Sequence, residues 1–241
     1  MAQERLQKII SEAGICSRRK AELLIRQKRL SINGKIANIG DKADICIDKV
    51  SIDGEQIYRR LPHIVILVNK PIGYISSCND NHGRPTILNL IPSHLRDGLY
   101  PIGRLDLNSR GAILLSNHGE LALHITHPRY DHSKTYEVKV RGNPNERSLS
   151  LWRNGLILDG KQTKESKIEI LESKCNETVL KVIMREGKKR QIRRIAKIIG
   201  CPVIDLKRTA IGHIHLNDLK EGNWRIVHQE EWEKFLPKKN D

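Results

Sequence analysis

The stretch "GRLDLNSRGAILLSN", residues 103–117, carries the strongest structural signal in the chain. It places Asp106 between Arg104 and Arg110, in a loop bounded by glycines, directly before an apolar run typical of a buried strand. Because a neighbouring cation favours the ionised form of a carboxyl group, we expect the arginines to keep Asp106 charged and to orient it. By spacing alone, this aspartate is either a structural residue that caps its own loop or a reactive group.

The overall composition indicates the kind of partner. The chain has 241 residues and a formal net charge of +15, and aromatic residues make up only 4% of it. An excess of positive charge this large favours a polyanionic partner, usually nucleic acid, and a solvated basic surface is the alternative. The scarcity of aromatic residues argues against recognition by stacking on many single-stranded bases, so contacts to the backbone of folded RNA fit better.

The cysteines and the apolar runs indicate where the protein works. The five cysteines are widely spaced and include no CxxC pair, which predicts reduced thiols rather than a zinc ribbon or a disulfide framework. The first residues, "MAQERLQKIISEAG", lack the apolar region of a signal peptide, and the longest aliphatic run, "IVILV" at 64–68, is too short to cross a bilayer. We therefore expect a cytoplasmic protein with no membrane partner.

Residues 1–60 form a pattern of their own. Apolar residues at helical spacing predict a helix that Gly14 ends, and Ser17 is a good N-cap for a second helix, "RRKAELLIRQK". Asn33-Gly34 predicts a type I′ hairpin turn, and a further strand pair follows within residues 44–57. Basic residues crowd the second helix and its exit, which favours contact with phosphates over a merely solvated helix face. They are Arg18, Arg19, Lys20, Arg26, Lys28 and Arg29.

The chain changes character after "RRLPH", residues 59–63, which reads as a linker. Residues 61–241 interleave predicted strands and helices, so we expect an α+β fold with a mixed, mainly antiparallel sheet. Expected strands lie within 64–77, 134–142, 167–184 and 203–216, and expected helices within 117–128, 145–156 and 188–200. In the last of these helices we expect Ile192, Ile195, Ile198 and Ile199 to face inward.

Common catalytic and metal-binding motifs do not occur. The chain lacks the P-loop, dinucleotide-binding, nucleophile-elbow and HExxH patterns, and the Asp106 loop has the wrong residues for a calcium loop or a kinase catalytic loop. Four histidines, His118, His124, His127 and His132, follow no metal-ligand spacing, so they are better read as surface or phosphate-contacting residues. We expect no metal.

Four ordered motifs resemble a known family. "VNKPIGY" (68–74), "YPIGRLDLNSRGAILLSNHGELA" (100–122), "KTYEV" (134–138) and "EGKKRQIRRIAKIIGCPVIDLKRTAIG" (186–212) closely resemble the RsuA-type ribosomal RNA pseudouridine synthases. Residues 1–60 look like the small αL-type RNA-binding domain that often precedes the catalytic domain of that family. The resemblance covers nearly the whole chain.

The resemblance implies an isomerase that converts a uridine of ribosomal RNA into pseudouridine without a nucleotide cofactor or a metal. It implies that Asp106 is the nucleophile, and that its carboxylate either forms a covalent link with the anomeric carbon or assists a deprotonation. Tyr136 matches the family's active-site tyrosine, which stacks on the base. Arg193 is our choice for the ion-pair partner of Asp106.

The expected partner is ribosomal RNA or a ribosome assembly intermediate, bound by a monomer. Further RNA contacts are expected from basic residues beside the motifs, namely Arg104, Lys188, Lys189, Arg190, Arg194, Lys207 and Arg208. General likeness favours a large-subunit (23S) target over a small-subunit (16S) one. The alternative from another class is a non-catalytic RNA-binding assembly factor that has kept the fold.

Overall fold

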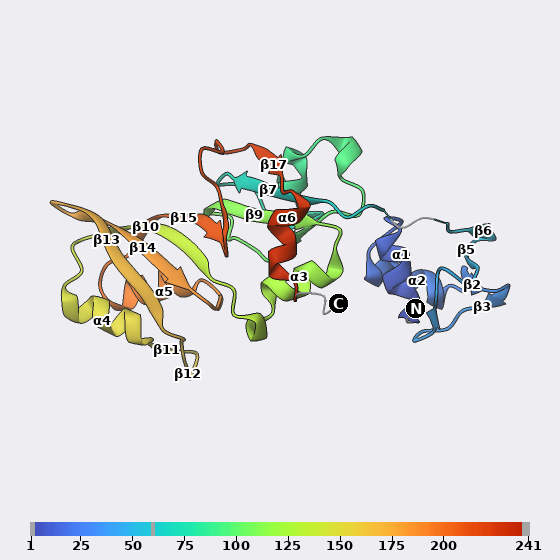
Figure 1. Ribbon diagram of the computed structural model, residues 1–241. Coiled ribbons are helices and arrows are strands. Elements are labelled where there is room, and N and C mark those ends of the chain that lie inside the picture. Colours follow the sequence, from blue (N-terminus) through green and yellow to red (C-terminus); the bar gives the residue numbers. More distant parts are fainter. Residues whose placement is uncertain (1–2, 59–60, 238–241) are drawn as a thin grey trace. The chain divides into compact units, whose positions relative to one another are not determined.

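The computed structural model describes residues 3–58 and 61–237 (Figure 1). It divides into two compact units. The first contains Met1–Ile64 with the segments Pro92–Tyr100 and Ser116–Gly119, and the second contains the remaining residues. The predicted division at residue 60, and residues 59 and 60 of the predicted linker, lie outside the described residues.

The first unit packs two helices against small sheets. Ser17 caps the second helix as predicted, because its side chain accepts a hydrogen bond from the Lys20 N–H at 3.3 Å. Gly14, with φ of +76°, follows the first helix. The helices are α1 (Leu6–Glu12) and α2 (Arg18–Arg26), and the strands are β1 (Glu4–Arg5), β2 (Leu30–Ile32), β3 (Lys35–Ile36), β4 (Lys42–Ala43), β5 (Val50–Ile52) and β6 (Glu55–Gln56).

Two tight turns set the register of the four-stranded sheet β3-β2-β5-β6. Asn33 and Gly34 have φ of 51° and 79°, the left-handed values that a type I′ turn requires, and Asp53 and Gly54 repeat this between β5 and β6. Both hairpins are therefore confirmed. One face of the sheet joins α1 and α2 in a core that includes Leu6, Ile25, Leu30 and Val50.

The second unit is built on one mixed sheet. Its described strands follow the order β13-β14-β10-β15-β9-β7-β17, with β16 beside β15 and β8 beside β9. The strands are β7 (Val65–Lys70), β8 (Tyr100–Ile102), β9 (Arg110–Ser116), β10 (Lys134–Arg141), β13 (Ser166–Lys174), β14 (Glu177–Met184), β15 (Val203–Ile211), β16 (Ile214–His215) and β17 (Trp224–Ile226). The strands β11 (Ile157–Leu158) and β12 (Lys161–Gln162) form a separate hairpin.

The junction of β9 and β15 is a parallel pairing, whereas β10 pairs antiparallel with both β14 and β15. Gly111 lies at this junction with φ of +110°, and a Cβ there would lie 2.2 Å from the carbonyl oxygen of Arg208. Only glycine allows the two backbones to approach so closely. The glycine of "RGAILL" thus places the start of β9, and the loop before it, against β15.

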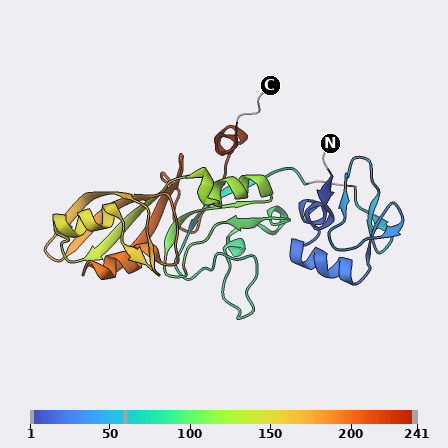
Figure 2. The same cartoon turned by 90° about the horizontal axis from the view of Figure 1, so that it is seen from below.

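Helices cover both halves of the sheet (Figures 1 and 2). Helix α4 (Glu146–Asn154) contacts β13, and α5 (Gln191–Ile198) contacts β15. Helices α3 (Gly119–Thr126) and α6 (Gln229–Trp232) supply Leu121 and Trp232 to a core with Leu67 of β7 and Leu114 of β9. Short 3₁₀ turns, Ile87–Leu90, Ser93–Leu95, Pro128–Tyr130 and Glu233–Phe235, complete the described elements.

The expected α+β fold with a mixed, mainly antiparallel sheet is confirmed, but the last basic helix differs in detail. It begins at Gln191, so residues 185–190 precede it as a loop. Ile192 and Ile195 face the core, while Ile198 is 58% exposed. Residues 192, 195, 196 and 199 share a face at 3.6 residues per turn, and residue 198 falls beside that face.

Candidate active site

The loop that carries Asp106 is held by the segment that follows β7. The Ser76 hydroxyl donates to the Leu105 carbonyl oxygen at 3.0 Å and accepts from the Leu105 N–H at 3.1 Å. The Gly73 N–H donates to the Leu107 carbonyl oxygen at 3.0 Å, and the Ser109 N–H closes the turn onto the Asp106 carbonyl oxygen. The backbone on both sides of Asp106 is thereby fixed, so its side chain projects from a rigid support.

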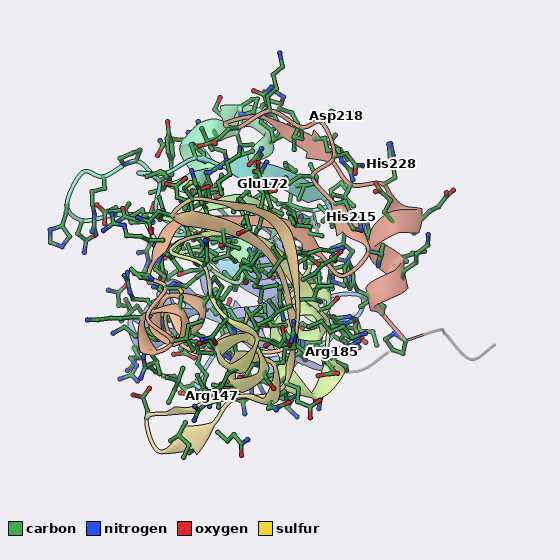
Figure 3. The ribbon with its side chains drawn as sticks, turned by 90° about the vertical axis from the view of Figure 1, so that its left-hand side faces the viewer. Arg147, Glu172, Arg185, His215, Asp218 and His228 are labelled. Carbon is green, nitrogen blue, oxygen red and sulfur yellow. The ribbon has the colours of Figure 1, made fainter. Side chains whose placement is uncertain are left out.

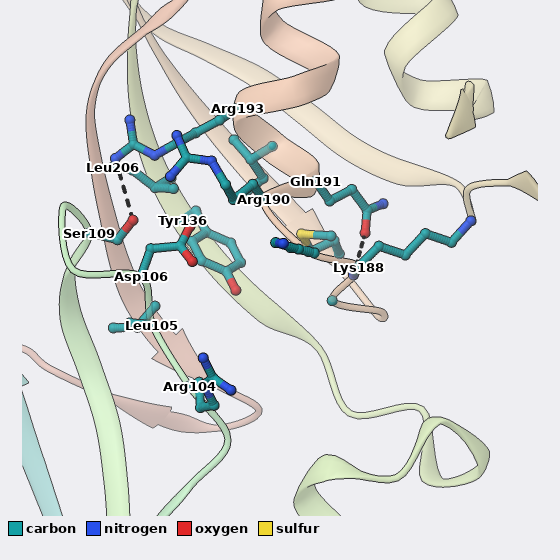
Figure 4. Close-up of a pocket in the computed structure, with 14 residues that line it drawn as sticks. Arg104, Leu105, Asp106, Ser109, Tyr136, Lys188, Arg190, Gln191, Arg193 and Leu206 are labelled. Carbon is teal, nitrogen blue, oxygen red and sulfur yellow. Dashed lines mark hydrogen bonds between the residues drawn. The ribbon is translucent and has the colours of Figure 1, made fainter. Parts of the chain in front are cut away.

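Asp106 lies in a cavity of about 600 Å³ (Figure 4). Its side chain is partly exposed, and no hydrogen bond or ion pair to its carboxylate occurs among the residues that the structure describes. Tyr136 and Leu206 line the same cavity, as do the basic side chains of Arg104, Arg190 and Arg193. The aspartate therefore faces an open, basic cavity instead of capping its own loop with its side chain.

Tyr136 reaches the cavity from the middle of the sheet. It lies on β10 opposite Val182 of β14 and Arg208 of β15, and it is only 9% exposed. Figure 4 shows its ring beside the Asp106 side chain. A ring in this place offers an apolar face to a planar base and carries a hydroxyl at its far end. Asp106 and Tyr136, both predicted as active-site residues, thus lie in one cavity.

Arg193 is present in the cavity but is not bonded as expected. Its Nη2 donates to the Asn108 carbonyl oxygen at 2.5 Å and lies 3.4 Å from the Ser109 hydroxyl. No ion pair between Arg193 and Asp106 occurs within the described part of the chain. Burial lowers the pKa of the guanidinium, as does the charge of Arg190, while the charge of Asp106 acts in the opposite direction. Arg193 thus supports the loop and acts on the carboxylate only through its field.

The two arginines that flank Asp106 in sequence do different things. Arg104 is exposed and lines the cavity. Arg110 turns away to Asp205, with N–O distances down to 2.6 Å, and approaches Glu221 at 3.4 Å. The expectation that both arginines hold Asp106 is therefore wrong, because neither bonds to its carboxylate among the described residues. Arg110 points elsewhere because β9 has begun there and its side chain meets the acids of neighbouring segments.

Lys70 is a charged residue near this site that the sequence reasoning missed. It ends β7 and is fully buried, and its Nζ donates to the Pro71 carbonyl oxygen at 2.8 Å. Burial lowers its pKa to about 8, although the charges of Glu221 and Asp106 favour the protonated form. A lysine that ends an apolar run directly before Pro71 was the available signal. It adds a buried positive charge whose field reaches Asp106.

Some residues predicted to bind RNA are exposed, and others are buried or bonded to other groups of the protein. All six of the basic residues around α2 are exposed, although Arg29 also pairs with Asp53. Lys189 and Arg190, which line the cavity, are exposed, and Lys207 of β15 is partly exposed. The Lys188 ammonium donates to the carbonyl oxygens of residues 161 and 162, and Arg194 pairs with an aspartate. Arg208 is only 5% exposed, so it lies inside the protein and not on its exposed surface.

The four histidines set aside as metal ligands contact aromatic rings or the backbone. The His127 ring accepts a hydrogen bond from the Arg129 N–H at 3.2 Å. His118 stacks on His63, His124 stacks on Tyr130, and His132 meets Phe235 edge-on. Over residues 3–58 and 61–237, no cluster of three or more metal-ligating side chains is present. No described helix is long and apolar enough to cross a membrane.

The geometry permits one kind of chemistry in particular. A carboxylate on a rigid loop, beside an aromatic ring and among cations, can attack an electrophilic carbon of an anionic substrate. Basic side chains at the rim attract a polyanion, and the ring receives a planar group.

Two family models match the chain. The model described as RNA pseudouridylate synthase matches residues 64–197, which include Asp106, Tyr136 and Arg193, and the S4 domain matches residues 4–44. Over 96% of its length the chain is 37% identical to an "uncharacterized RNA pseudouridine synthase" of Aquifex aeolicus, covering 93% of that protein. Over 92% of its length it is 36% identical to "ribosomal large subunit pseudouridine synthase B" of Bacillus subtilis, covering 91% of that protein.

Further matches agree with these. The "dual-specificity RNA pseudouridine synthase RluF" of Salmonella typhi is 36% identical over 94% of this chain, which covers 76% of that protein. A solved structure titled "Crystal structure of pseudouridylate synthase" superposes with a TM-score of 0.70 at 30% identity, covering 96% of this chain and 99% of the other. The chain belongs to the RNA pseudouridylate synthase family, in its RsuA/RluB branch, and carries an N-terminal S4 domain.

Proposed function

We propose that this protein converts a specific uridine of ribosomal RNA into pseudouridine, that the uridine lies in large-subunit RNA, and that Asp106 is the nucleophile. The observation that carries the proposal is the partly exposed carboxylate of Asp106, which has no bonded partner among the described residues, in a basic cavity beside Tyr136. The net charge of +15 supports an RNA substrate. The printed names of the Bacillus subtilis and Salmonella typhi relatives support ribosomal RNA and, in the first case, its large subunit.

The reaction begins with exposure of the target base. A base in folded RNA must leave its stack before a carboxylate can reach its sugar, at a cost of a few kcal/mol. Phosphate contacts from the exposed basic residues of α2 and from the exposed Lys189 and Arg190 offset that cost. The unstacked uracil then lies against the Tyr136 ring, with C1′ of its ribose facing Asp106.

The chemical steps are balanced without a cofactor. A carboxylate oxygen of Asp106 bonds to C1′ while the bond from C1′ to N1 breaks and N1 keeps the electron pair. The freed uracil turns, and its C5 bonds to C1′ while the bond from C1′ to the carboxylate breaks. C5 then loses a proton and N1 gains one, so the product is an isomer of the substrate. The buried charge of Lys70 and the guanidinium of Arg193 stabilise the negative carboxylate when it departs.

The decisive experiment combines a variant with a map of the product. Ribosomal RNA from cells that lack the gene should miss one pseudouridine of the large-subunit RNA, and the wild-type gene should restore it. Asp106→Asn should fail to restore it while the purified variant binds RNA with nearly unchanged affinity. Asp218→Asn, at an exposed site (labelled in Figure 3) that does not line the cavity, is the matched control and should restore the modification.

The remaining outcomes select the alternatives. A missing pseudouridine in the small-subunit RNA would move the target to that subunit and leave the chemistry intact. If every pseudouridine persists without the gene, and the purified protein also forms none, the protein is a non-catalytic assembly factor. Restoration by Asp106→Asn would overturn the nucleophile assignment. We also assign the protein to the cytoplasm, where ribosomal RNA is modified.

A further inference from the structure

A second cavity, of about 220 Å³, adjoins the catalytic cavity. The two share Arg104, Tyr136 and Gly187 in their walls, so they lie next to each other. Lys134 of β10 and Arg208 of β15 line only the second cavity. The proposed reaction uses neither of these cations, so they are free to bind another group.

Arg208 is a buried cation with unused hydrogen-bond donors. It is 5% exposed, and its Nε donates to the Ala112 carbonyl oxygen at 2.6 Å. Neither of its Nη atoms has a hydrogen-bond partner among the described residues, and Nη2 is fully buried. An unsatisfied buried donor on a charged group is costly, and native structures retain one mainly where a ligand or solvent completes it.

Lys134 places a second positive charge in the same wall. Its Nζ donates to the His132 carbonyl oxygen at 3.0 Å, and no ion pair to it occurs in the described part of the chain. Burial lowers the pKa of Lys134, and the charge of Arg208 lowers it further. The two cations repel each other across a cavity, an arrangement that an anion between them would relieve.

The carboxylates in this wall are already engaged. Asp131 pairs with Lys164 and with Arg185, each at 3.0 Å. Glu186 accepts hydrogen bonds from the Gln191 amide at 2.6 Å and from the Lys164 N–H at 2.9 Å. The acids thus neutralise other groups, and the cavity keeps a local excess of positive charge.

We infer that the second cavity binds a phosphate group of the RNA strand, next to the nucleotide that Asp106 attacks, through Lys134 and Arg208. The inference rests on the proposed function, because the position of the phosphate follows from a ribose at Asp106. Because both cavities have Arg104 and Tyr136 in their walls, they are close enough for neighbouring groups of one strand to occupy both. The guanidinium fork and the ammonium are the donors that bind phosphate oxygens best, whereas uracil is neutral and needs no pair of cations.

A phosphate at this place would also orient the substrate. With the strand anchored in the second cavity, the ribose stays at Asp106 while the detached uracil turns. Lys134 and Arg208 are therefore positioning residues, which touch the strand and not the reacting atoms.

The first test needs no catalysis and uses the full chain. The Arg208 Nε–H is hydrogen-bonded and buried, so its NMR resonance should exchange slowly with water and be observable. Titration with inorganic phosphate should shift this resonance saturably in the wild type. Lys134→Gln should weaken phosphate binding by about tenfold, since one charge-assisted hydrogen bond is lost. Lys134→Arg should keep the binding, and Lys174→Gln, at an exposed position of β13, is the matched control.

The outcomes of this test are distinct. A resonance that phosphate does not move, or that moves equally in Lys134→Gln, overturns the inference. A shift caused by uridine and not by phosphate would make the cavity a base site and would also overturn it. The unfolding temperature of each variant separates loss of a site from loss of the fold.

The second test asks whether the phosphate belongs to RNA. In an Asp106→Asn background, Lys134→Gln should reduce the slope of log Kd against log salt concentration for ribosomal RNA by about one. An unchanged slope would mean that the cavity takes free phosphate only, against the inference. Because neither test measures pseudouridine, the site can stand if the proposed reaction fails, and it can fail if the reaction stands.

Discussion

The buried ammonium of Lys70 should make the stability of the second unit depend on pH above neutrality. The side chain is fully buried, and burial lowers its pKa from 10.5 to about 8. At pH 7 both the folded and the unfolded chain hold the proton, and the folded chain carries the cost of the buried charge. Between pH 8 and 10.5 the folded chain releases the proton while the unfolded chain keeps it, so the free energy of unfolding rises with pH.

Lys70→Met isolates this contribution. Each pKa unit corresponds to about 1.4 kcal/mol, so the lysine should gain about 2–3 kcal/mol relative to the variant between pH 7 and pH 10. Because all three tryptophans belong to the second unit, their fluorescence in a urea titration reports on that unit alone. Other groups titrate in both proteins and cancel in the difference. Lys167→Met, an exposed substitution on β13, controls for the loss of one positive charge.

The result that would refute the reasoning is a stability difference between wild type and Lys70→Met that stays constant from pH 7 to pH 10. A difference that moves in favour of the variant as pH rises would refute it equally. Either result would mean that Lys70 is solvated or fully paired, and that it places no buried positive charge near Asp106.

Three further perturbations have defined outcomes. Gly111→Ala should lower the free energy of unfolding by about 3 kcal/mol, because the new Cβ would lie 2.2 Å from the backbone of β15. Gly160→Ala, where φ is also positive but no atom lies near the new Cβ, should lower it by about 1 kcal/mol. Equal losses for the two variants in urea titrations would contradict this reasoning. Hydrogen bonds from Arg110 lower the pKa of Asp205. In urea titrations the wild type should therefore be more stable than Asp205→Asn at neutral pH, and this difference should vanish as the pH falls through the lowered pKa; a difference that does not change with pH would contradict this. Replacing Arg18 and Arg19 by Gln should reduce the salt slope of RNA binding by about two, and an unchanged slope would exclude phosphate contact by α2.

Sequence reasoning succeeded where local chemistry decides the structure. The Ser17 cap and the Asn33-Gly34 turn depend on neighbouring residues only, and both occur as expected. The alternating burial of β10, which places Tyr136 inward, follows from a period of two residues. Asp106 stood out because one carboxylate among arginines, directly before a buried strand, is an unusual combination.

Sequence reasoning failed where the bonding partner of a side chain comes from a distant segment of the chain. Arg110 is close to Asp106 in sequence, and Arg193 was expected beside it from its motif. In the structure Arg110 bonds to Asp205, and Arg193 bonds to the carbonyl oxygen of Asn108. Which of several arginines meets a given acid depends on strand register, and the parallel pairing of β9 with β15 has no signature within either strand. The burial of Arg208 follows from the same pairing, so composition could only suggest a basic surface there.

The parallel pairing of β9 with β15 has a consequence for synthesis of the protein. The Asp106 loop is made early, but the strand against which it rests ends at Ile211, and α5 lies between them in the sequence. Such long-range pairing forms only after its later partner is available. A nascent chain emerging from the ribosome therefore exposes its basic helix α2 well before the walls of the Asp106 cavity are complete. The RNA contacts that we propose for α2 can therefore form more than half the length of the polypeptide before the Asp106 cavity is complete.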